Sequence, residues 1–283
     1  MKKIKRRLDV ILQEQMPDLS RNQVASFIVQ GLVTVDGKVV IKAGAQVKED
    51  SVIVCAAKQP KFVSRAGFKL EKALDYFGVD VTGLVALDAG ISTGGFTDCM
   101  LQRGIKRVYG VDVGYGLVHE KVYRDDRVVL LERTNLRYLE KLPELVDLVT
   151  LDLAFISVLK VMPAVLNLMK TDGKLIVLIK PQFEAERGEV GKGGIVRDAA
   201  VHESVVKKIV AGVCAFGFES KGVTDSPILG TSGNKEFLGY FIRSSIGLRS
   251  TRESLKLQED AALSEIARIR DVKGAKTVAH EDA

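Results

Sequence analysis

The apolar residues of the chain follow different patterns before and after residue 60. In the N-terminal part the apolar segments are short, and they predict two helices and then three strands, at residues 8–16, 20–28, 32–35, 38–41 and 51–54. Asp36-Gly37 separates the first two of these strands and is typical of a tight hairpin turn. The pattern therefore predicts a small α+β domain of residues 1–57.

After residue 64, apolar runs alternate with helical segments. The runs predict strands at residues 84–87, 108–113, 128–131, 147–153, 175–179, 219–224 and 240–242. Helical spacing of apolar residues marks residues 64–74, 96–103, 158–170 and 199–216. This alternation predicts an α/β fold with a mostly parallel sheet and helices on both of its faces.

The segments between these patterns set the domain boundaries. Pro60 interrupts a short linker, residues 58–63, so the α/β domain covers residues 64–247. Residues 248–283 are charged, with sparse leucines and isoleucines, and predict an amphipathic helix and a frayed end. We assign no chemistry to this tail.

The first apolar run of the α/β domain leads directly into a glycine-rich turn. The acid that ends the run, the turn glycines and the first residue of the next helix are Asp88, Gly90, Gly94, Gly95 and Phe96. Glycines permit backbone conformations and close approaches that a Cβ atom would block, which indicates a nucleotide-type cofactor at the helix N-terminus. Asp112 ends the second run, at about the spacing at which doubly wound folds place an acid on ribose hydroxyls.

The spacing within the turn narrows the choice of cofactor. A dinucleotide site has the pattern G-x-G-x-x-G, whereas here three residues separate Gly90 from Gly94. A P-loop ends in Gly-Lys-Ser or Gly-Lys-Thr, but Gly95 is followed by Phe96 and Thr97. Acids at the tips of two strands suit a cofactor with an ammonium group and ribose hydroxyls. We therefore expect S-adenosylmethionine.

The composition is that of an ordinary globular protein with a small basic excess. Lys and Arg number 42 against 36 Asp and Glu, a net charge of +6, and the ten basic and six acidic residues within positions 1–60 account for +4 of it. This excess permits a polyanionic partner. The widely spaced Cys55, Cys99 and Cys214 predict reduced thiols in a cytoplasmic protein, with no metal site. The apolar runs are strand-length, so we expect no stable membrane association.

Two charged residues end strands where open α/β sheets bind ligands. Asp152 follows the run at residues 147–151, and Lys180 follows the run at residues 175–179. A lysine there either extends its ammonium to solvent or lies in a cleft where burial lowers its pKa and lets it act as a base. Taken alone, Lys69 and Glu236 are typical surface residues.

The N-terminal region resembles the S4 RNA-binding domain. The similarity lies in two helices, the second beginning at Ser20-Arg21 and ending at Gly31, followed by Val-Thr-Val-Asp-Gly-Lys. The resemblance implies phosphate contacts by Arg6, Arg7, Arg21, Lys38 and Lys42. We add Arg65, at the start of the α/β domain, to this RNA-binding set. Phosphate contacts position a protein on RNA without selecting a base.

The α/β domain resembles the FtsJ-type ribose 2'-O-methyltransferases. Their Lys-Asp-Lys-Glu tetrad is matched in order by Lys69, Asp152, Lys180 and Glu236. With the S4-like domain and the segments Asp-Ala-Gly-Ile-Ser-Thr-Gly-Gly-Phe-Thr-Asp, Val-Asp-Val-Gly-Tyr-Gly, Lys-Pro-Gln-Phe-Glu and Gly-Thr-Ser-Gly-Asn-Lys-Glu-Phe, the chain resembles the TlyA family up to about residue 245. This implies a Rossmann-like class I methyltransferase fold. It also implies 2'-O-methylation of cytidine in 23S, and in some members 16S, ribosomal RNA, with ribosomal RNA or subunits as partners.

The resemblance also implies roles for individual residues. Lys180 would take or orient the proton of the ribose hydroxyl, Asp152 and Glu236 would position that lysine, and Lys69 would steady the ribose or its phosphate. The residues implied to contact S-adenosylmethionine are Asp88, Gly90, Ser92, Gly94, Gly95, Phe96, Asp112, Thr134 and Asn135.

Other functions fit the sequence less well. Base N-methylation calls for two prolines after the fourth strand, and Asp152-Leu153-Ala154-Phe155 has none. C5-methylation of cytosine calls for a nucleophilic cysteine, usually beside proline, and none of the three cysteines lies beside one. Many TlyA-family members are labelled hemolysins, but a membrane-active protein would need a long apolar or amphipathic segment. The remaining alternative is an RNA-binding protein with a catalytically idle α/β domain. Its test is whether the four tetrad residues meet at one cavity.

Overall fold

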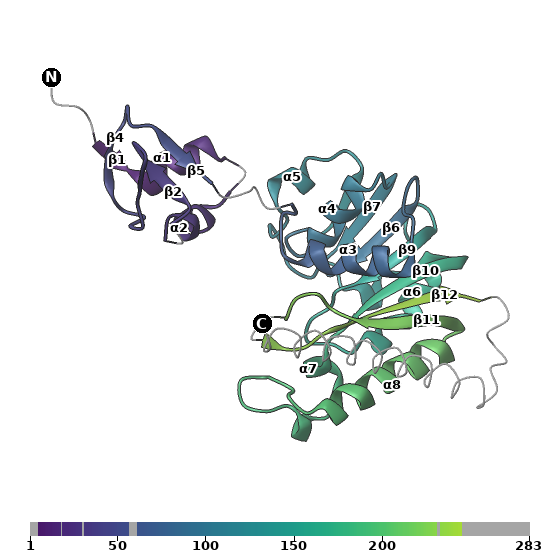
Figure 1. Ribbon diagram of the computed structural model, residues 1–283. Helices are drawn as coiled ribbons and strands as arrows, with labels where there is room; N and C mark the ends of the chain where they lie inside the picture. The colour runs from purple at the N-terminus through teal and green to yellow at the C-terminus, as the bar shows by residue number, and fades with distance from the viewer. Residues whose placement is uncertain (1–4, 18, 30, 57–60, 231–232, 245–283) are drawn as a thin grey trace. The chain divides into compact units, whose positions relative to one another are not determined.

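The computed structural model describes residues 5–17, 19–29, 31–56, 61–230 and 233–244 (Figure 1). The chain divides into two compact units between Lys61 and Phe62, within the segment predicted as a linker. The predicted tail at residues 248–283 lies outside the described residues.

The first unit combines two helices with two small sheets. The helices are α1 (Leu8–Gln15) and α2 (Arg21–Val29), and the strands are β1 (Lys5–Arg7), β2 (Val33–Val35), β3 (Lys38–Val39), β4 (Gln46–Lys48) and β5 (Ile53–Cys55). Strands β3, β2 and β5 form one antiparallel sheet, and β1 pairs with β4 in the other. Apolar residues of both helices and of β2 and β4 form a shared core.

The hairpin of this unit follows from its turn residues. Asp36 and Gly37 both have positive φ, +50° and +77°, which is the backbone of the turn that best matches the twist of two antiparallel strands. In contrast, the sequence pattern missed β1 and β4. Strand β1 is Lys-Arg-Arg, so it has no apolar alternation and is defined only by its backbone pairing with β4.

The second unit is built on one seven-stranded sheet, in the order β11-β12-β10-β9-β6-β7-β8. These strands are β6 (Val85–Ala89), β7 (Arg107–Val111), β8 (Val128–Leu131), β9 (Val146–Leu151), β10 (Met169–Ile179), β11 (Phe218–Asp225) and β12 (Phe237–Arg243). Strands β10, β9, β6, β7 and β8 are parallel, and β12 runs antiparallel to its neighbours β10 and β11. The prediction of a mostly parallel sheet is confirmed.

Helices cover both faces of this sheet (Figure 1). Helices α3 (Ala66–Phe77) and α4 (Gly95–Gln102) pack on one face, and α6 (Met162–Leu168) and α8 (Ala199–Ala215) pack on the other. The shorter elements are α5 (Glu120–Tyr123), α7 (Pro181–Glu184) and the 3-10 helices η1 (Leu136–Tyr138), η2 (Val158–Lys160) and η3 (Arg187–Glu189). In β6, Val85 and Leu87 face the core under α6 and α8, whereas Ala86 faces the core under α3 and α4. This alternation is the period of two expected of a strand buried on both sides.

One predicted helix was wrong in its extent. Residues 158–170 form the 3-10 helix η2, then α6, and the chain enters β10 at Met169. Pro163 lies in the first turn of α6. Because proline lacks a backbone N–H, it is tolerated in the first turn but would break a helix that continued through it.

The order of the strands determines where a ligand can bind. Strand β6 is followed by β7 on one side of it, whereas β9 and β10 lie on its other side. In open α/β sheets the crevice at such a reversal, outside the carboxyl ends of the strands, is the usual ligand site.

Candidate active site

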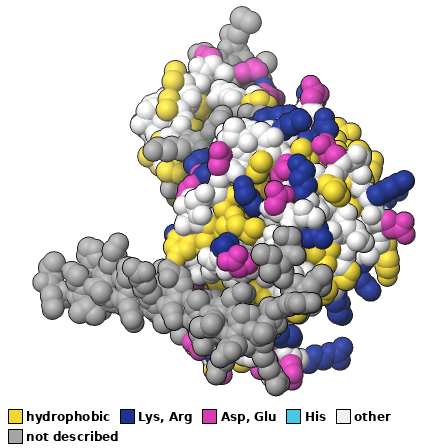
Figure 2. Space-filling view, turned by 90° about the vertical axis from the view of Figure 1, so that its right-hand side faces the viewer, with side chains coloured by type: hydrophobic (Ala, Val, Ile, Leu, Met, Phe, Trp, Pro, Cys, Tyr) yellow, Lys and Arg dark blue, Asp and Glu magenta, His cyan; other side chains and the backbone are white. Residues whose placement is uncertain are grey.

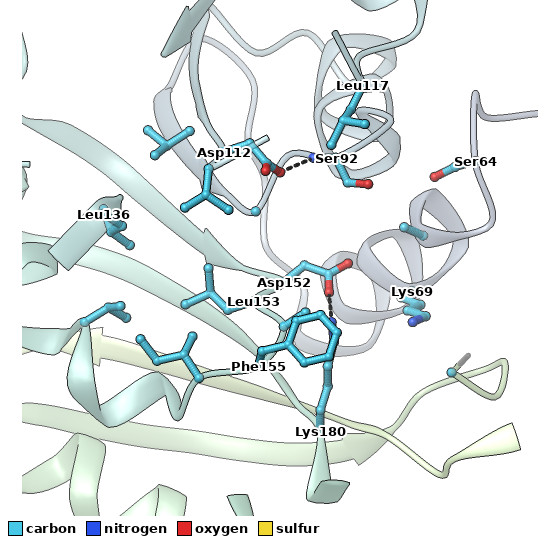
Figure 3. Close-up of a pocket in the computed structure, with 18 of the residues that line it drawn as sticks. Ser64, Lys69, Ser92, Asp112, Leu117, Leu136, Asp152, Leu153, Phe155 and Lys180 are labelled. Atoms are coloured by element: carbon cyan, nitrogen blue, oxygen red, sulfur yellow. Dashed lines mark hydrogen bonds and ion pairs between the residues drawn. The ribbon is translucent and has the colours of Figure 1, made fainter. Parts of the chain in front are cut away.

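A pocket of about 890 Å³ opens at the carboxyl edge of the parallel strands (Figure 3). Its walls come from the N-terminal end of α3, from the loops after β6, β7, β8, β9 and β10, and from the segment before β12. The site residues predicted from the sequence that line it are Arg65, Lys69, Gly90, Ser92, Asp112, Thr134, Asn135, Asp152, Lys180 and Glu236. The structure therefore brings all four tetrad residues to one cavity. This convergence is the observation expected to distinguish an active domain from a catalytically idle one.

The glycine turn after β6 depends on its lack of side chains. Gly90 has φ +82°, and a Cβ atom there would lie 2.5 Å from the backbone oxygen of Asp152. Gly94 has φ +93°, and a Cβ atom on Gly95 would lie 2.2 Å from Ser64 Oγ. Because neither the backbone angles nor the space admits a side chain, the turn can lie close against the loop after β9.

Asp112 is held in place at the end of β7. Its Oδ2 accepts a hydrogen bond from the backbone N–H of Ser92 at 2.9 Å (Figure 3), and its Oδ1 accepts one from the backbone N–H of Gly114 at 2.8 Å. Each carboxylate oxygen can accept a second bond, so Asp112 presents oriented acceptors to the pocket. This is the chemistry that ribose hydroxyls require.

Thr134 and Asn135 follow β8 on the same side of the pocket. The Thr134 hydroxyl donates to the backbone oxygen of Glu132 at 3.0 Å, and Asn135 Oδ1 accepts from the backbone N–H of Arg137 at 3.1 Å, capping η1. Each side chain therefore makes one hydrogen bond that shapes the loop and has further hydrogen-bonding capacity.

Asp88 lies behind the turn instead of lining the pocket. Its carboxylate is fully buried and accepts hydrogen bonds from Thr97 Oγ1 at 2.6 Å and Thr150 Oγ1 at 2.8 Å. Burial raises the pKa of Asp88 to about 6, although these two hydrogen bonds oppose the rise. Gly94, Gly95 and Phe96 are likewise absent from the residues that line the pocket. The sequence predicts that Asp88, Gly94, Gly95 and Phe96 contact the cofactor directly. In the structure they form or support the turn and do not line the pocket.

The four tetrad residues form two ion pairs. Lys180 Nζ lies 2.6 Å from Asp152 Oδ1, and Lys69 Nζ lies 2.5 Å from Glu236 Oε2. The side chains of the first pair are 13% and 17% exposed, and those of the second are 11% and 2% exposed. Breaking either pair would leave a charge that water solvates poorly, so each partner fixes the position of the other.

The second pair differs from the prediction that Glu236 positions Lys180. Glu236 precedes β12, and Lys180 follows β10 next to it, where Ile179 and Phe237 are paired. Yet the Glu236 carboxylate bonds to Lys69 of α3, because α3 covers that face of the sheet and brings an ammonium group to it. The order of these residues along the sequence does not predict this contact.

Gly230 and Phe155 also belong to the site, although the sequence did not predict them as site residues. A Cβ atom on Gly230 would lie 2.0 Å from Glu236 Oε1, so only glycine leaves room for that carboxylate. Gly230 begins the segment Gly-Thr-Ser-Gly-Asn-Lys-Glu-Phe, which was a signal for it. Phe155 is 91% exposed, has φ +64° and lines the pocket, and the hydrophobic pattern gives no sign of it.

The basic residues predicted to contact RNA differ in their contacts. Arg6 pairs with Glu14 and Glu49, whereas Arg7 and Arg21 both bond to the buried Asp9. Hydrogen bonds from Arg7, and then from Arg21, lower the pKa of Asp9 against the effect of burial. Lys38, Lys42 and Arg65 are exposed, and Arg65 lines the pocket of the second unit.

Among the described residues there is no group of three His, Cys, Asp or Glu side chains suited to a metal ion, and none of the helices has the length and apolar character needed to cross a membrane. On the face seen in Figure 2, Lys and Arg side chains lie interspersed with Asp and Glu.

Two protein families match the chain. The FtsJ-like methyltransferase family matches residues 62–243, and the S4 domain matches residues 6–53. The solved structure of a Streptococcus thermophilus protein named as a hemolysin is 36% identical, with 94% of this chain and 98% of that chain covered and a TM-score of 0.68.

Relatives of known name are similar along most of their length. Hemolysin A of Brachyspira hyodysenteriae is 39% identical over 240 residues, which cover 83% of this chain and 99% of the relative. The 16S/23S rRNA (cytidine-2'-O)-methyltransferase TlyA of Mycobacterium tuberculosis is 38% identical over 262 residues, which cover 92% of this chain and 97% of the relative. These matches confirm the resemblance seen in the motifs. The chain belongs to the TlyA family, in which an S4 domain precedes an FtsJ-like methyltransferase domain.

Proposed function

We propose that this chain transfers a methyl group from S-adenosylmethionine to the 2'-hydroxyl of a cytidine in ribosomal RNA. The observation that supports this best is that Gly90 and Ser92 of the glycine turn line one pocket together with both lysine–carboxylate pairs. Relatives support the substrate: TlyA of Mycobacterium tuberculosis is named for 16S and 23S rRNA, and TlyA of Campylobacter jejuni for 23S rRNA. We take 23S rRNA as the first candidate substrate and 16S rRNA as the second.

The residues at the carboxyl edge fit S-adenosylmethionine. Gly90 leaves space that a Cβ atom would fill, and Asp112 offers oriented acceptors for ribose hydroxyls. Ser92, Thr134 and Asn135 add polar groups to the same wall. When bound, S-adenosylmethionine would supply an electrophilic methyl group on its sulfonium, with the neutral thioether as the leaving group.

The chain's own part in this reaction is to orient and deprotonate the ribose hydroxyl. A ribose hydroxyl is a weak nucleophile at neutral pH, so a base at the oxygen lowers the barrier. Lys180 takes or orients the hydroxyl proton at Nζ as the new carbon–oxygen bond forms. Asp152, whose Oδ1 lies 2.6 Å from Nζ, holds Lys180 in position for this step.

The pair of Lys69 and Glu236 acts on the other side of the ribose. Lys69 donates hydrogen bonds to the ribose or to its phosphate, and Glu236 holds Lys69 at the wall of the pocket. Holding the reacting oxygen in line with the methyl group supplies much of the rate enhancement, since effective molarity depends on such alignment.

Phe155 is suited to stack on the target base. Its ring is 91% exposed at the mouth of the pocket and lies 5.1 Å from the ring of Phe183. Unpaired RNA bases stack on exposed aromatic rings, at about 1–3 kcal/mol per base. The S4 domain would add phosphate contacts through Lys38, Lys42 and the arginines. With ribosomal RNA as substrate, we expect a cytoplasmic protein.

The test is methyl transfer from labelled S-adenosylmethionine to separated ribosomal RNAs and subunits from a host that lacks this methylation. Wild type should yield labelled 2'-O-methylcytidine, and Lys180→Ala should lower the rate by about 10² to 10⁴, the range of general base catalysis. Lys170→Ala is the matched control, because Lys170 lies at the other end of β10 and pairs with Asp147 of β9 at 2.5 Å.

Each outcome is informative. Full activity of Lys170→Ala beside an inactive Lys180→Ala supports the role of the pocket lysine. Cofactor binding by wild type without label in any RNA or subunit would refute the proposed substrate.

A further inference from the structure

Three contacts connect the loop after β9 to the segment after β10. Asp152 bonds to Lys180, Phe155 packs against Phe183, and Glu184 Oε1 accepts the backbone N–H of Val158 at 2.8 Å. The first two contacts lie at the pocket, whereas Glu184 is 3% exposed and is not among the residues that line it. Its carboxyl group has no part in the reaction proposed above.

The loop held by these contacts contains backbone strain. Phe155 has φ +64°, a conformation that a bulky side chain adopts at a cost of about 1–3 kcal/mol unless its surroundings hold it there. On the N-terminal side the loop is fixed by the ion pair of Asp152 and by the bond from its backbone N–H to Ala89 O at 3.0 Å. On the C-terminal side Glu184 bonds to Val158, the first residue of η2.

Glu184 is itself firmly placed. Lys208 of α8 donates to its backbone oxygen at 2.8 Å, and the backbone N–H of Ala185 donates to Pro181 O at 2.9 Å. Burial raises the pKa of the Glu184 carboxyl, opposed by hydrogen bonds from Ser157 and from Val158. The neutral acid is therefore favoured relative to an exposed glutamate, and an amide of the same shape can replace it.

We propose that Glu184 is a positioning residue for methyl transfer, which holds the loop at residues 153–158 so that Asp152 and Phe155 face Lys180. This inference rests on the proposed function of the pocket. Without the Val158 contact, Phe155 can relax to an ordinary φ and withdraw its ring, and Asp152 loses its fixed position relative to Lys180.

The test compares Glu184→Ala with Glu184→Gln. We expect Glu184→Ala to lower kcat for RNA methylation at least tenfold with an unchanged KM for S-adenosylmethionine, and Glu184→Gln to retain wild-type kcat, because its amide oxygen can accept the Val158 N–H. Adding Phe155→Ala to Glu184→Ala should cost much less than the product of the two single effects, since both act through one loop.

Ile105→Ala is the control for lost stability. Ile105 is 1% exposed in the core beneath α4, and its truncation should lower the Tm without changing kcat below that Tm. Wild-type kcat in Glu184→Ala, or an equal loss in Glu184→Gln, would overturn the proposal. So would an equal loss of kcat in Ile105→Ala at a matched fall in Tm.

Hydrogen exchange separates this inference from the proposed function. The Val158 amide should exchange slowly in wild type and in Glu184→Gln, and rapidly in Glu184→Ala, whether or not any RNA is methylated. If wild type methylates no RNA, the proposed function fails and exchange still shows whether Glu184 holds the loop. An unchanged Val158 exchange rate in Glu184→Ala refutes the positioning role.

Discussion

The lysines of the pocket are 11% and 13% exposed and each pairs with its own carboxylate, whereas Arg7 and Arg21 of the S4 domain are 49% and 54% exposed and share Asp9. In the pocket, shielding from water strengthens each electrostatic contact and fixes the groups proposed to act on the ribose hydroxyl. In the S4 domain, Asp9 holds both guanidinium groups, and their exposed N–H donors stay available for the proposed phosphate contacts.

The charges proposed to perform chemistry are thus buried and paired, whereas the charges proposed to position RNA are exposed and share one carboxylate.

The largest difference in methylation rate should appear when the shared or paired carboxylate is removed from each region in turn. Asp152→Ala should lower kcat by about 10² to 10⁴, because Lys180 loses the group that orients it and stabilises its ammonium. Asp9→Ala should leave the single-turnover rate at saturating RNA unchanged, since Asp9 lies in the other unit. Rapid-quench measurement of methyl transfer would check both. Equal losses in the two variants would contradict this difference between the two regions.

The next effect concerns the buried acid behind the glycine turn. The pKa of Asp88 is raised from 3.8 to about 6 in the folded protein, so between these values the folded state binds more protons than the unfolded state. Stability should therefore fall as pH rises from about 4 to 6 and then level, by at most roughly 3 kcal/mol from this group. In Asp88→Asn this part of the pH dependence should disappear. Urea unfolding at several pH values measures it, and an unchanged slope would contradict the assignment.

A smaller effect should follow from filling the space beside Glu236. Gly230→Ala would bring a Cβ atom within 2.0 Å of Glu236 Oε1, so the carboxylate must move and its bond to Lys69 must weaken. We expect about a tenfold loss of kcat, the effect of losing roughly 1.4 kcal/mol of positioning. Gly188→Ala is the matched control, because it has nothing within 4 Å of the added Cβ. Full activity of Gly230→Ala would show that the pair tolerates displacement.

The smallest effect should come from the exposed lysines of the S4 domain. The double variant Lys38→Ala and Lys42→Ala should weaken RNA binding a few-fold and reduce its salt dependence, because each lost phosphate contact releases about one counterion less. The Tm should not change, since both side chains are exposed. Binding assays at several salt concentrations would check it. An unchanged salt slope would remove these lysines from the RNA-binding set.

Local patterns were sufficient for most of the fold. The apolar runs predicted the five parallel strands, most directly β6, which is buried along its whole length and is apolar up to Asp88. Asp36-Gly37 predicted its hairpin, because few residue pairs accept positive φ at both positions. The end of α6 and the start of β10 were missed, since the change of state at Met169 depends on pairing with Val146 of β9.

The sequence was sufficient to predict that the proposed site residues lie together at the carboxyl edge. Gly90 has to be glycine because of its turn, and Asp112, Asp152 and Lys180 line one pocket because parallel strands all end on one side. The pairing of individual charges follows instead from packing between distant segments. Glu236 bonds to Lys69 because α3 packs over β12, and the buried Asp88 accepts hydrogen bonds from Thr97 and Thr150. Phe155 has a positive φ in a loop whose Val158 N–H donates to the distant Glu184. Such contacts join residues far apart in the chain, and no local periodicity encodes them.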